Sequence, residues 1–464
     1  MSDSANALPA GAAAVLREVL GDDRLLLDPA DRWTYGYDNS RVQALPAAVA
    51  MPLDADEVAG IVQVCRRFRL PLTTRGRGTG TAGAAVPSEG GIALSTERMD
   101  RIVKIDAANR IAVVQPGVTN SALQAAVGAQ GFFWPPDPTS ADYCSVGGNL
   151  ACNAAGPRAV KYGTARENTL GLEAVTGSGK RIRTGTCTTK GVVGLDLTRL
   201  IVGSEGTLAV ITEATLKLTP LPERIATVRA AFTDIGAAAR AVSRIMAQPV
   251  VPSALEFMDS AAVALVRERT PAGLPAGTGA MLMIEVDGLA DQLAGSLAAL
   301  AAAARDDGLL EWRATTEPAE AKALWAARKA LSPALRSIAP VKVNEDVVVP
   351  VSGIPALAAA LETLAERHRV RIVSFGHAGN GNIHVNLLGT PADRPRLEAC
   401  LEEVFREVLA LGGTLSGEHG IGTEKRRFVA LELGPEELAL MRAVKSVFDP
   451  DGIMNPGKAL PGPD

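Results

Sequence analysis

The sequence predicts an α+β protein with at least two domains. The chain has 464 residues, enough for two or three domains with full hydrophobic cores. From residue 226 to 410, strand-like segments alternate with Ala-rich helical segments, as expected for a sheet layered with helices. The segment Thr219-Pro-Leu-Pro222 comes directly before this region and marks a domain boundary.

Composition excludes several classes of protein. With 47% hydrophobic and 21% charged residues, the chain is globular rather than disordered. A net charge of −4 gives no electrostatic case for nucleic-acid binding. The 5 cysteines form no C-x-x-C pair, which argues against a disulfide framework or zinc knuckle and favours a reducing, cytoplasmic location. No signal peptide or apolar span of about 20 residues is present, so we expect no transmembrane helix.

The first unusual stretch is a Gly-rich loop after two predicted amphipathic helices, residues 10–20 and 55–69. Glycines 78, 80 and 83 give the pattern G-x-G-x-x-G. A Rossmann site requires a helix directly after this pattern, and Ala84-Ala-Val-Pro87 leaves no room for one. The loop is better interpreted as backbone N–H groups arranged around a pyrophosphate, with a merely flexible loop as the alternative.

Two further segments follow predicted strands at 92–94 and 111–114. Residues 134–156 combine prolines, which stiffen an extended segment, with small residues against which a flat ligand can lie. Residues 202–212 read as a tight turn leading into a strand.

Residues 374–388, SFGHAGNGNIHVNLL, contain two of the 4 histidines. The run Gly379-Asn-Gly-Asn382 has turn chemistry, so we predict strand, tight turn, strand. Strand alternation then puts His384 and Asn386 on one face, with His377 a few ångströms from His384.

A third histidine lies in a second Gly-rich segment, SGEHGIG at 416–422, where Glu418 precedes His419. Two imidazoles and one carboxylate can bind a divalent metal and leave coordination positions open. A single histidine is more often structural or solvated. Three of the 4 histidines nevertheless lie in two short polar segments, which packing does not explain, so the pattern predicts a site.

Six motifs then occur in order: Arg75–Gly80, Pro135–Gly148, Gly203–Leu208, His377–His384, Gly417–Gly422 and Asn455–Lys458. Together they resemble the FAD-dependent 2-hydroxy acid dehydrogenases of the vanillyl-alcohol oxidase fold. That group includes D-lactate dehydrogenase, D-2-hydroxyglutarate dehydrogenase and the glycolate oxidase flavoprotein subunit. The resemblance spans nearly the whole chain.

The resemblance implies an FAD-binding domain of two α+β subdomains at residues 1–222. A substrate (cap) domain would occupy 223–412, and a C-terminal segment, 413–464, would return to the FAD domain. The implied FAD contacts are Arg75, Gly76, Arg77, Gly78, Thr79, Gly80, Gly83, Pro136, Asp137, Thr139, Ser140, Gly147, Gly148, Asn153, Gly156, Gly163, Val202, Gly206, Ile211 and Asn455. Relatives with covalent flavin carry a histidine in or near the first Gly loop. No histidine precedes residue 368 here, so we expect non-covalent FAD.

The same resemblance implies the chemistry. Oxidation of a 2-hydroxy acid requires a base, a carboxylate anchor and a group that lowers the hydroxyl pKa. His377, His384 and Glu418 match the family's metal ligands, with zinc as the natural ion and manganese or iron as alternatives. His419 matches the catalytic base, and Asn386 matches a substrate-contacting asparagine.

The remaining substrate contacts lie between these segments. Arg328 and Ser332 are expected on one helical face, matching the family's Arg and Ser/Thr contacts, with a surface arginine as the alternative. Lys342 and Asn344 share a face of an apolar strand. We expect Lys342 to bind a second substrate carboxylate, which favours D-2-hydroxyglutarate over D-lactate. The rival interpretation pairs Lys342 with Asp346.

A different class of function also stays open. The chain could serve as a flavin- or metal-binding subunit of a larger complex without turnover of its own, as the glycolate oxidase flavoprotein subunit suggests. The resemblance implies an external electron acceptor, a quinone or an electron-transfer protein. It leaves a homodimer and peripheral attachment to the inner membrane open.

Overall fold

A computed structural model describes residues 7–269 and 273–462, which form two compact units. The first unit contains residues 1–155, 163–221 and 418–464, and the second contains 156–162 and 222–417. The boundary after Leu221 falls within the proline-rich segment. Residues 156–162, which the sequence placed in the first domain, pack in the second unit because Tyr162 donates a hydrogen bond to Asp287 at 2.7 Å.

The first unit begins with a four-stranded sheet in the order β1-β2-β4-β3. Asp54 caps the longest helix of this region by accepting from the N–H groups of Asp56 and Glu57, as expected for an N-cap aspartate. The apolar faces of α1 and α3 then form a core with this sheet. The elements are α1 (Ala12–Leu20), β1 (Leu25–Leu26), α2 (Pro29–Trp33), β2 (Ala48–Ala50), α3 (Ala55–Phe68), β3 (Leu72–Arg75) and β4 (Ile92–Ser95). The Gly-rich loop between β3 and β4 contains no helix, as predicted.

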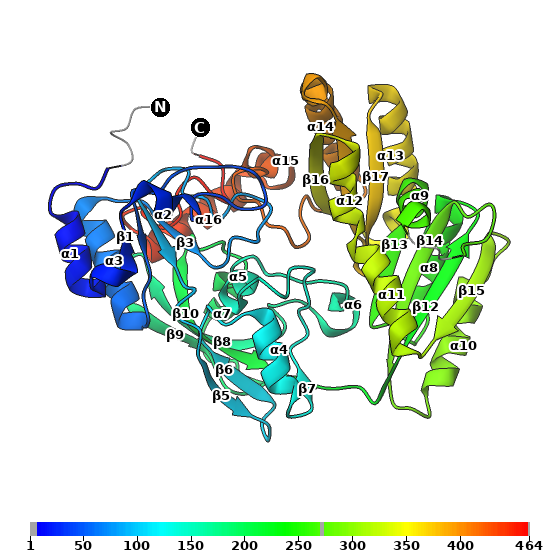
Figure 1. The fold of residues 1–464 in the computed structure, drawn as a ribbon, viewed down its shortest axis with the longest axis horizontal. Coiled ribbons are helices and arrows are strands. Elements are labelled where there is room, and N and C mark those ends of the chain that lie inside the picture. The colour runs from blue at the N-terminus through cyan, green and yellow to red at the C-terminus, as the bar shows by residue number, and fades with distance from the viewer. Residues whose placement is uncertain (1–6, 270–272, 463–464) are drawn as a thin grey trace. The chain divides into compact units, whose positions relative to one another are not determined.

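A five-stranded antiparallel sheet follows, in the order β5-β6-β10-β8-β9. Its buried face packs against α4, α5 and α16 around Trp134 (Figure 1). The elements are β5 (Ile102–Asp106), β6 (Ile111–Val114), α4 (Asn120–Gly128), β7 (Phe132–Phe133), α5 (Val146–Ala151), β8 (Thr169–Thr176), β9 (Arg181–Gly185), α7 (Leu197–Ile201), β10 (Ala209–Lys217), β11 (Thr219–Pro220), α15 (Val429–Glu432) and α16 (Pro435–Phe448).

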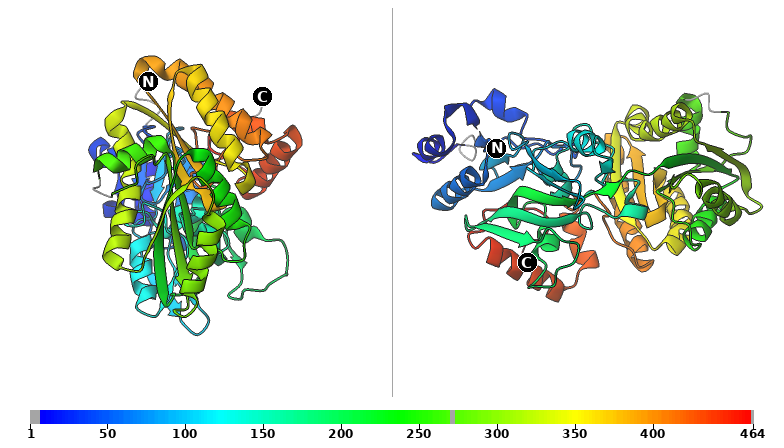
Figure 2. Two further views of the ribbon diagram at one scale, coloured as in Figure 1. Left: turned by 90° about the vertical axis from the view of Figure 1, so that its right-hand side faces the viewer. Right: turned by 90° about the horizontal axis from the view of Figure 1, so that it is seen from below.

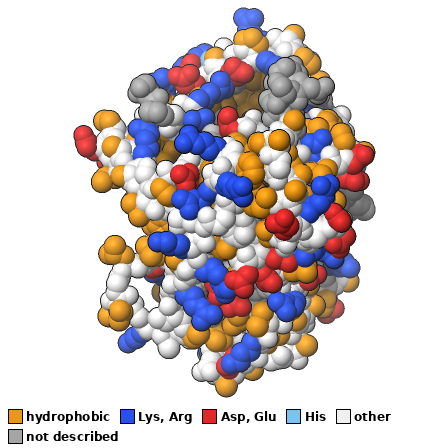
Figure 3. All heavy atoms as spheres, turned by 90° about the vertical axis from the view of Figure 1, so that its left-hand side faces the viewer, with side chains coloured by type: hydrophobic (Ala, Val, Ile, Leu, Met, Phe, Trp, Pro, Cys, Tyr) orange, Lys and Arg blue, Asp and Glu red, His pale blue; other side chains and the backbone are white. Residues whose placement is uncertain are grey.

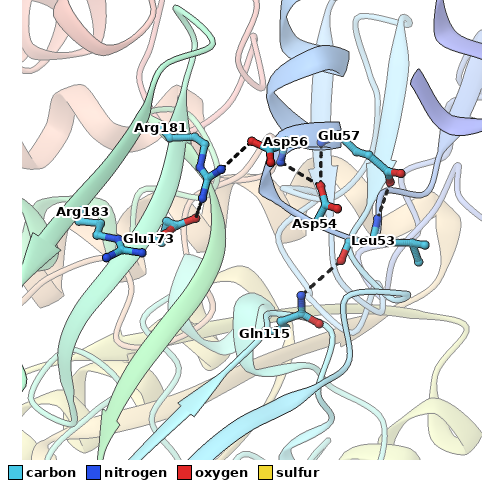
Figure 4. Close-up of polar contacts among 8 residues, drawn as sticks. All are labelled: Leu53, Asp54, Asp56, Glu57, Gln115, Glu173, Arg181 and Arg183. Atoms are coloured by element: carbon cyan, nitrogen blue, oxygen red, sulfur yellow. Dashed lines mark hydrogen bonds and ion pairs between the residues drawn. The ribbon is translucent and has the colours of Figure 1, made fainter. Parts of the chain in front are cut away.

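Polar contacts tie the two sheets of the first unit together (Figure 4). Arg181 on β9 donates to Asp56 in α3 at 2.6 Å and to Glu173 on β8 at 2.8 Å. The Gln115 amide donates to the Leu53 carbonyl at 3.3 Å. The two sheets therefore form one unit rather than two independent lobes. On the face shown in Figure 3, basic and acidic side chains lie interspersed, in keeping with nearly balanced totals of 47 and 51.

The C-terminal segment completes the first sheet. The Leu72 N–H of β3 donates to the Ile453 carbonyl, and the Asn455 N–H donates back to the Leu72 carbonyl, both at 2.8 Å. Met454, between them, is fully buried in the core beneath the sheet.

The second unit is a seven-stranded antiparallel sheet in the order β15-β12-β14-β13-β17-β18-β16, with helices on both faces (Figure 2). Helices α8, α10, α13 and α14 pack on one face, and α9, α11 and α12 pack on the other. The elements are α6 (Ala159–Tyr162), β12 (Arg224–Phe232), α8 (Ile235–Met246), β13 (Ala254–Met258), α9 (Ser260–Arg269), β14 (Ala280–Gly288), α10 (Leu293–Ala304), β15 (Leu309–Thr315), α11 (Pro318–Lys329), α12 (Leu331–Ile338), β16 (Val341–Val348), α13 (Ile354–His368), β17 (Arg371–His377), β18 (Asn382–Gly389) and α14 (Arg394–Ala410).

These elements confirm the alternation of strands and helices expected between 226 and 410. None of the helices in the described ranges combines the length and apolar character needed to cross a bilayer.

Candidate active site

A polar stripe crosses four neighbouring strands on one face of the seven-stranded sheet. Paired residues of an antiparallel sheet point to the same face, so the register identifies its members. Glu256 on β13 pairs with His377 on β17. His384 on β18 pairs with Phe375, and Asn386 pairs with Asn344 on β16. The face that carries α9, α11 and α12 therefore also carries these polar side chains.

The two histidines are brought together by the predicted strand–turn–strand. A short 3-10 turn, Ala378–Asn380, joins β17 to β18, and Gly381 follows with φ +74°. A Cβ at Gly381 would lie 1.8 Å from the Val349 carbonyl oxygen, so only glycine fits this turn. The rings of His377 and His384 meet edge to face with centroids 5.1 Å apart.

The same two histidines and Glu418 form a group able to hold a metal ion. One ligand atom from each of the three residues lies within 4.8 Å of the others, and no second such group occurs among residues 7–269 and 273–462. Glu418 directly follows Gly417, the last residue of the second unit, whose N–H donates to the Asp346 carbonyl at 2.9 Å. His419 is the next residue and is half-buried.

The buried carboxylate of Glu256 contacts one of these three residues, His377. Glu256 is fully buried, and its Oε1 lies 2.5 Å from Nδ1 of His377. Its Oε2 accepts from Nε and Nη2 of Arg328 at 2.8 and 2.7 Å. Burial alone would raise the pKa of Glu256, but His377 and Arg328 outweigh it and lower the pKa to about 2. The carboxylate is therefore ionised at neutral pH.

Arg328 and Ser332 do not share one continuous helix, which corrects the sequence expectation. Helix α11 ends at Lys329, and α12 begins at Leu331. Pro333 explains the break, because it lacks an N–H and its ring crowds the carbonyl four residues earlier. The Arg328 guanidinium also stacks over the Phe375 ring, 4.7 Å from its centroid, and is largely buried rather than on the surface.

The other predicted substrate residues lie on or beside the same face. Lys342, which is half-buried rather than buried, donates from Nζ to Ser332 Oγ at 2.9 Å. Asp346, its rival partner, accepts from Ser416 Oγ at 3.0 Å and from the Gly417 N–H at 2.9 Å. Asn386 is fully buried; its amide nitrogen donates to the Val373 and His384 carbonyls. Its Oδ1 has no hydrogen-bond partner among the described residues, leaving an acceptor for a ligand.

The donor set fits a divalent metal. Two imidazoles and one carboxylate are ligands that zinc accepts with a position left open for substrate. A carboxylate on the far ring nitrogen of a ligating histidine is the usual support for such a site, and Glu256 supplies it.

In the first unit, the Gly-rich loop packs against the start of α5. A Cβ at Gly76 would lie 2.4 Å from Ser145 Oγ, and Ser145 caps α5 through the Gly148 N–H. Gly147 and Gly148 thus lie in the short helix α5, and the sequence analysis had assigned no helix to these small residues. Arg75 is buried and donates to the Tyr37 and Thr34 carbonyls at 2.6 and 3.2 Å.

The 203–206 turn joins the same cluster. The Gly203 and Glu205 N–H groups donate to the Leu150 and Ala151 carbonyls of α5, both at 2.9 Å. The Asn455 amide donates to the Glu205 carbonyl at 2.6 Å and to the Ala84 carbonyl at 2.9 Å. Asn455 Oδ1 is buried without a partner in the described part of the chain. Four predicted cofactor segments therefore pack together beside an acceptor that has no partner among the described residues, which fits a polar cofactor such as FAD.

The remaining predicted cofactor residues differ in their surroundings. Asn153 accepts from the Thr164 hydroxyl and Arg166 N–H at 2.8 and 2.9 Å. Val202 accepts from Arg166 at 3.3 Å. Gly156 belongs to the second unit, whereas the other predicted FAD residues belong to the first: Arg77, Gly78, Thr79, Gly80, Gly83, Pro136, Asp137, Thr139, Ser140, Gly163, Gly206 and Ile211.

Comparison with known proteins identifies the class. A model described as "FAD binding domain" matches residues 46–185, and one described as "FAD linked oxidases, C-terminal domain" matches residues 221–459. The chain belongs to this family of FAD-linked oxidoreductases.

Its relatives narrow the class further. The chain is 38% identical over 447 residues to the glycolate oxidase subunit GlcD of Bacillus subtilis, covering 96% of this chain and 95% of the relative. It is 35% identical over 433 residues to the D-lactate dehydrogenase of Archaeoglobus fulgidus, covering 92% and 95%. Substrate-bound p-cresol methylhydroxylase superposes with a TM-score of 0.79 at 19% identity, covering 98% and 99%. The fold is therefore of the vanillyl-alcohol oxidase type, and the relatives support FAD-dependent oxidation of a hydroxy acid.

Proposed function

We propose that this protein oxidises a D-2-hydroxy acid to the 2-oxo acid, with non-covalent FAD and a divalent metal. The observation that carries the proposal is the placement of His377 and His384 beside the Glu256–Arg328 pair on one sheet face. Within a chain of the FAD-linked oxidase family, that combination supplies metal ligands and a carboxylate anchor together. The D configuration follows the relatives named D-lactate dehydrogenase.

Each residue has a role in this reaction. His377, His384 and Glu418 hold the metal, and Arg328 binds the substrate carboxylate with a guanidinium already fixed by Glu256 and Phe375. Asn386 Oδ1 accepts a hydrogen bond from substrate, and His419 takes the hydroxyl proton. When bound, the metal polarises the substrate hydroxyl and FAD accepts the hydride.

For the substrate, we propose an acid with a second carboxylate, D-2-hydroxyglutarate. Lys342 and Asn344 point to the face of the sheet that carries the site. They are two positions apart on β16, so their backbones are about 7 Å apart along the strand. Lys342 would bind the distal carboxylate, with Ser332 and Asn344 adding hydrogen bonds.

D-Lactate and glycolate form the second candidate. It is favoured by the Lys342–Ser332 hydrogen bond, which gives the lysine a partner without substrate, and by the names of the relatives. The relative named as a glycolate oxidase subunit also supports a role within a larger complex. In either setting the reduced flavin would pass its electrons to an external acceptor.

The proposal is tested by anaerobic bleaching of the flavin absorbance with D- and L-forms of 2-hydroxyglutarate and lactate, and with glycolate. We expect bleaching by a D-acid, its loss after chelation and dialysis, and its return with zinc or manganese. A yellow protein that no hydroxy acid bleaches would refute an independent enzyme and favour the subunit role. Full bleaching in a demonstrably metal-free sample would refute the metal.

A further inference from the structure

Glu256 contacts both the proposed metal ligand His377 and the proposed substrate anchor Arg328 on the sheet face. One of its carboxylate oxygens contacts Nδ1 of His377, and the other contacts two nitrogens of Arg328. The side chains of Glu256, His377 and Arg328 are 1%, 7% and 10% exposed, so water does not compete for these contacts.

The contact with His377 selects one form of the imidazole. A carboxylate can only accept, so Nδ1 must carry a proton, and in the neutral ring Nε2 then holds the lone pair. Nε2 is then the ring nitrogen available to a metal. Without Glu256, the proton could sit on either nitrogen, and the ring could rotate away from His384.

The contact with Arg328 fixes the guanidinium. Nε and Nη2 share one oxygen of Glu256 while Phe375 covers the guanidinium face, so the orientation of Nη1 is set. Glu256 also offsets the positive charge of Arg328, which would otherwise lie close to a divalent cation.

A purely stabilising ion pair is the competing explanation. Buried ion pairs contribute little net stability, because the cost of removing two charges from water offsets their attraction. This pair also lies on the face that holds the proposed metal ligands, at the edge of the apolar cluster that contains Phe375 and packs against α9 and α12.

We propose that Glu256 is a positioning residue that couples the metal ligand His377 to the substrate anchor Arg328. The inference rests on the proposed function and adds a residue that none of the sequence motifs contains.

The test uses full-length FAD-loaded protein and the variants Glu256→Gln, Glu256→Asp and Glu311→Gln. Glutamine matches glutamate in size but cannot accept from His377 and Arg328 together. Glu311→Gln is the matched control. Glu311 lies on β15, at the far edge of the same sheet, and its carboxylate forms an ion pair at 2.8 Å with the buried Arg229 on β12. Zinc affinity is measured by competition with a chromophoric chelator, without turnover.

We expect Glu256→Gln to weaken zinc binding by roughly 10- to 100-fold, the usual effect of losing such a support. Glu256→Asp, which keeps the charge, should fall between this variant and wild type, and Glu311→Gln should match wild type. At saturating zinc, KM for the hydroxy acid should stay raised in Glu256→Gln, because Arg328 has lost its partner. Should Glu256→Gln fail to fold, Glu256→Asp decides the test through its zinc affinity.

Wild-type zinc affinity in Glu256→Gln, or an equal loss in Glu311→Gln, would overturn the inference. If wild-type protein itself binds no zinc, or is reduced equally well without it, the proposed function fails instead. The two failures are therefore distinguishable.

Discussion

Oε2 of Glu205 lies 2.8 Å from the backbone nitrogen of Gly422, a residue 217 positions later in the chain. Its Oε1 accepts from the neighbouring Ile421 N–H at 2.6 Å. A fully buried side chain in the 203–206 turn thus holds the segment that follows Glu418 and His419. Burial raises the pKa of Glu205, while these two N–H groups lower it.

Replacing Glu205 by glutamine should destabilise this segment. The amide nitrogen is a donor, so one of the two backbone N–H groups loses its acceptor. We expect the free energy of unfolding to fall by about 1–3 kcal/mol, measured by urea denaturation. Glu18→Gln, at an exposed position of α1, is the control and should change nothing. Equal stability of the two variants would contradict the structural role of Glu205.

Trichloroacetic acid precipitation should release all of the flavin into the supernatant. The physical reason is that no histidine precedes residue 368, so the first Gly loop has no histidine side chain to form a covalent link. Absorbance spectra of the pellet and supernatant provide the measurement. Yellow colour retained in the washed pellet would show that the link exists.

His419→Asn should slow anaerobic flavin reduction by about 10²–10⁴-fold while FAD and zinc contents stay at wild-type levels. The expected size is that of losing a positioned general base. Stopped-flow absorbance gives the rate. His368→Asn is the matched control, because His368 contacts Glu403 on α14 at 3.1 Å, outside the polar stripe. A loss below tenfold would assign the proton to another group.

Lys342→Met should separate the two candidate substrates. If Lys342 binds a distal carboxylate, kcat/KM for D-2-hydroxyglutarate should fall. The fall should correspond to a loss of about 1.5–3 kcal/mol in transition-state stabilisation, the value of a charged hydrogen bond. The value for D-lactate should hardly change. Equal losses on the two acids would make Lys342 structural and favour the monocarboxylate.

Stability of the second unit should depend on Asp259. Burial raises the pKa of Asp259 to about 6 from 3.8, although the Ala262 and Ser374 N–H groups donate to its carboxylate. The folded state therefore holds a proton that the unfolded state releases between about pH 4 and 6. This contribution is fully present below pH 4 and is lost as the pH rises through 6.

The measurement is urea unfolding of wild type and Asp259→Asn at pH 4 and pH 7. Because asparagine does not titrate, the free energy of unfolding of wild type relative to Asp259→Asn should fall by about 2–2.5 kcal/mol between pH 4 and pH 7. A difference that is constant or grows with pH would show that Asp259 is not protonated in the folded protein.

Sequence reasoning succeeded where local chemistry decides the structure. The Gly-Asn run between His377 and His384 allowed only a tight turn, and alternation then fixed which residues share a face. It also excluded a helix after the Gly-rich loop, because Pro87 and the following glycines cannot continue one.

It failed where a contact joins distant segments. Glu256 is a single acid in the apolar strand ALEFM, 121 residues before His377, and only the strand order β13-β17 brings them together. A charged residue inside an apolar strand was the available signal. Pro333 was likewise an available signal for the break between Arg328 and Ser332, but the sequence analysis relied on the helical spacing of these two residues. Glu205 was visible only as a member of the 203–208 motif, and nothing local indicated that its side chain reaches Gly422.

The return of residues 453–455 to β3 also sets an order for folding during synthesis. Residues 222–417 are contiguous and make up nearly all of the second unit, so this unit can form while the ribosome is still adding the final segment. The N-terminal sheet is made first but cannot close until Met454 arrives in its core and Asn455 bonds to Leu72. The unit translated first is therefore completed last, and until then its first core lacks the Met454 side chain.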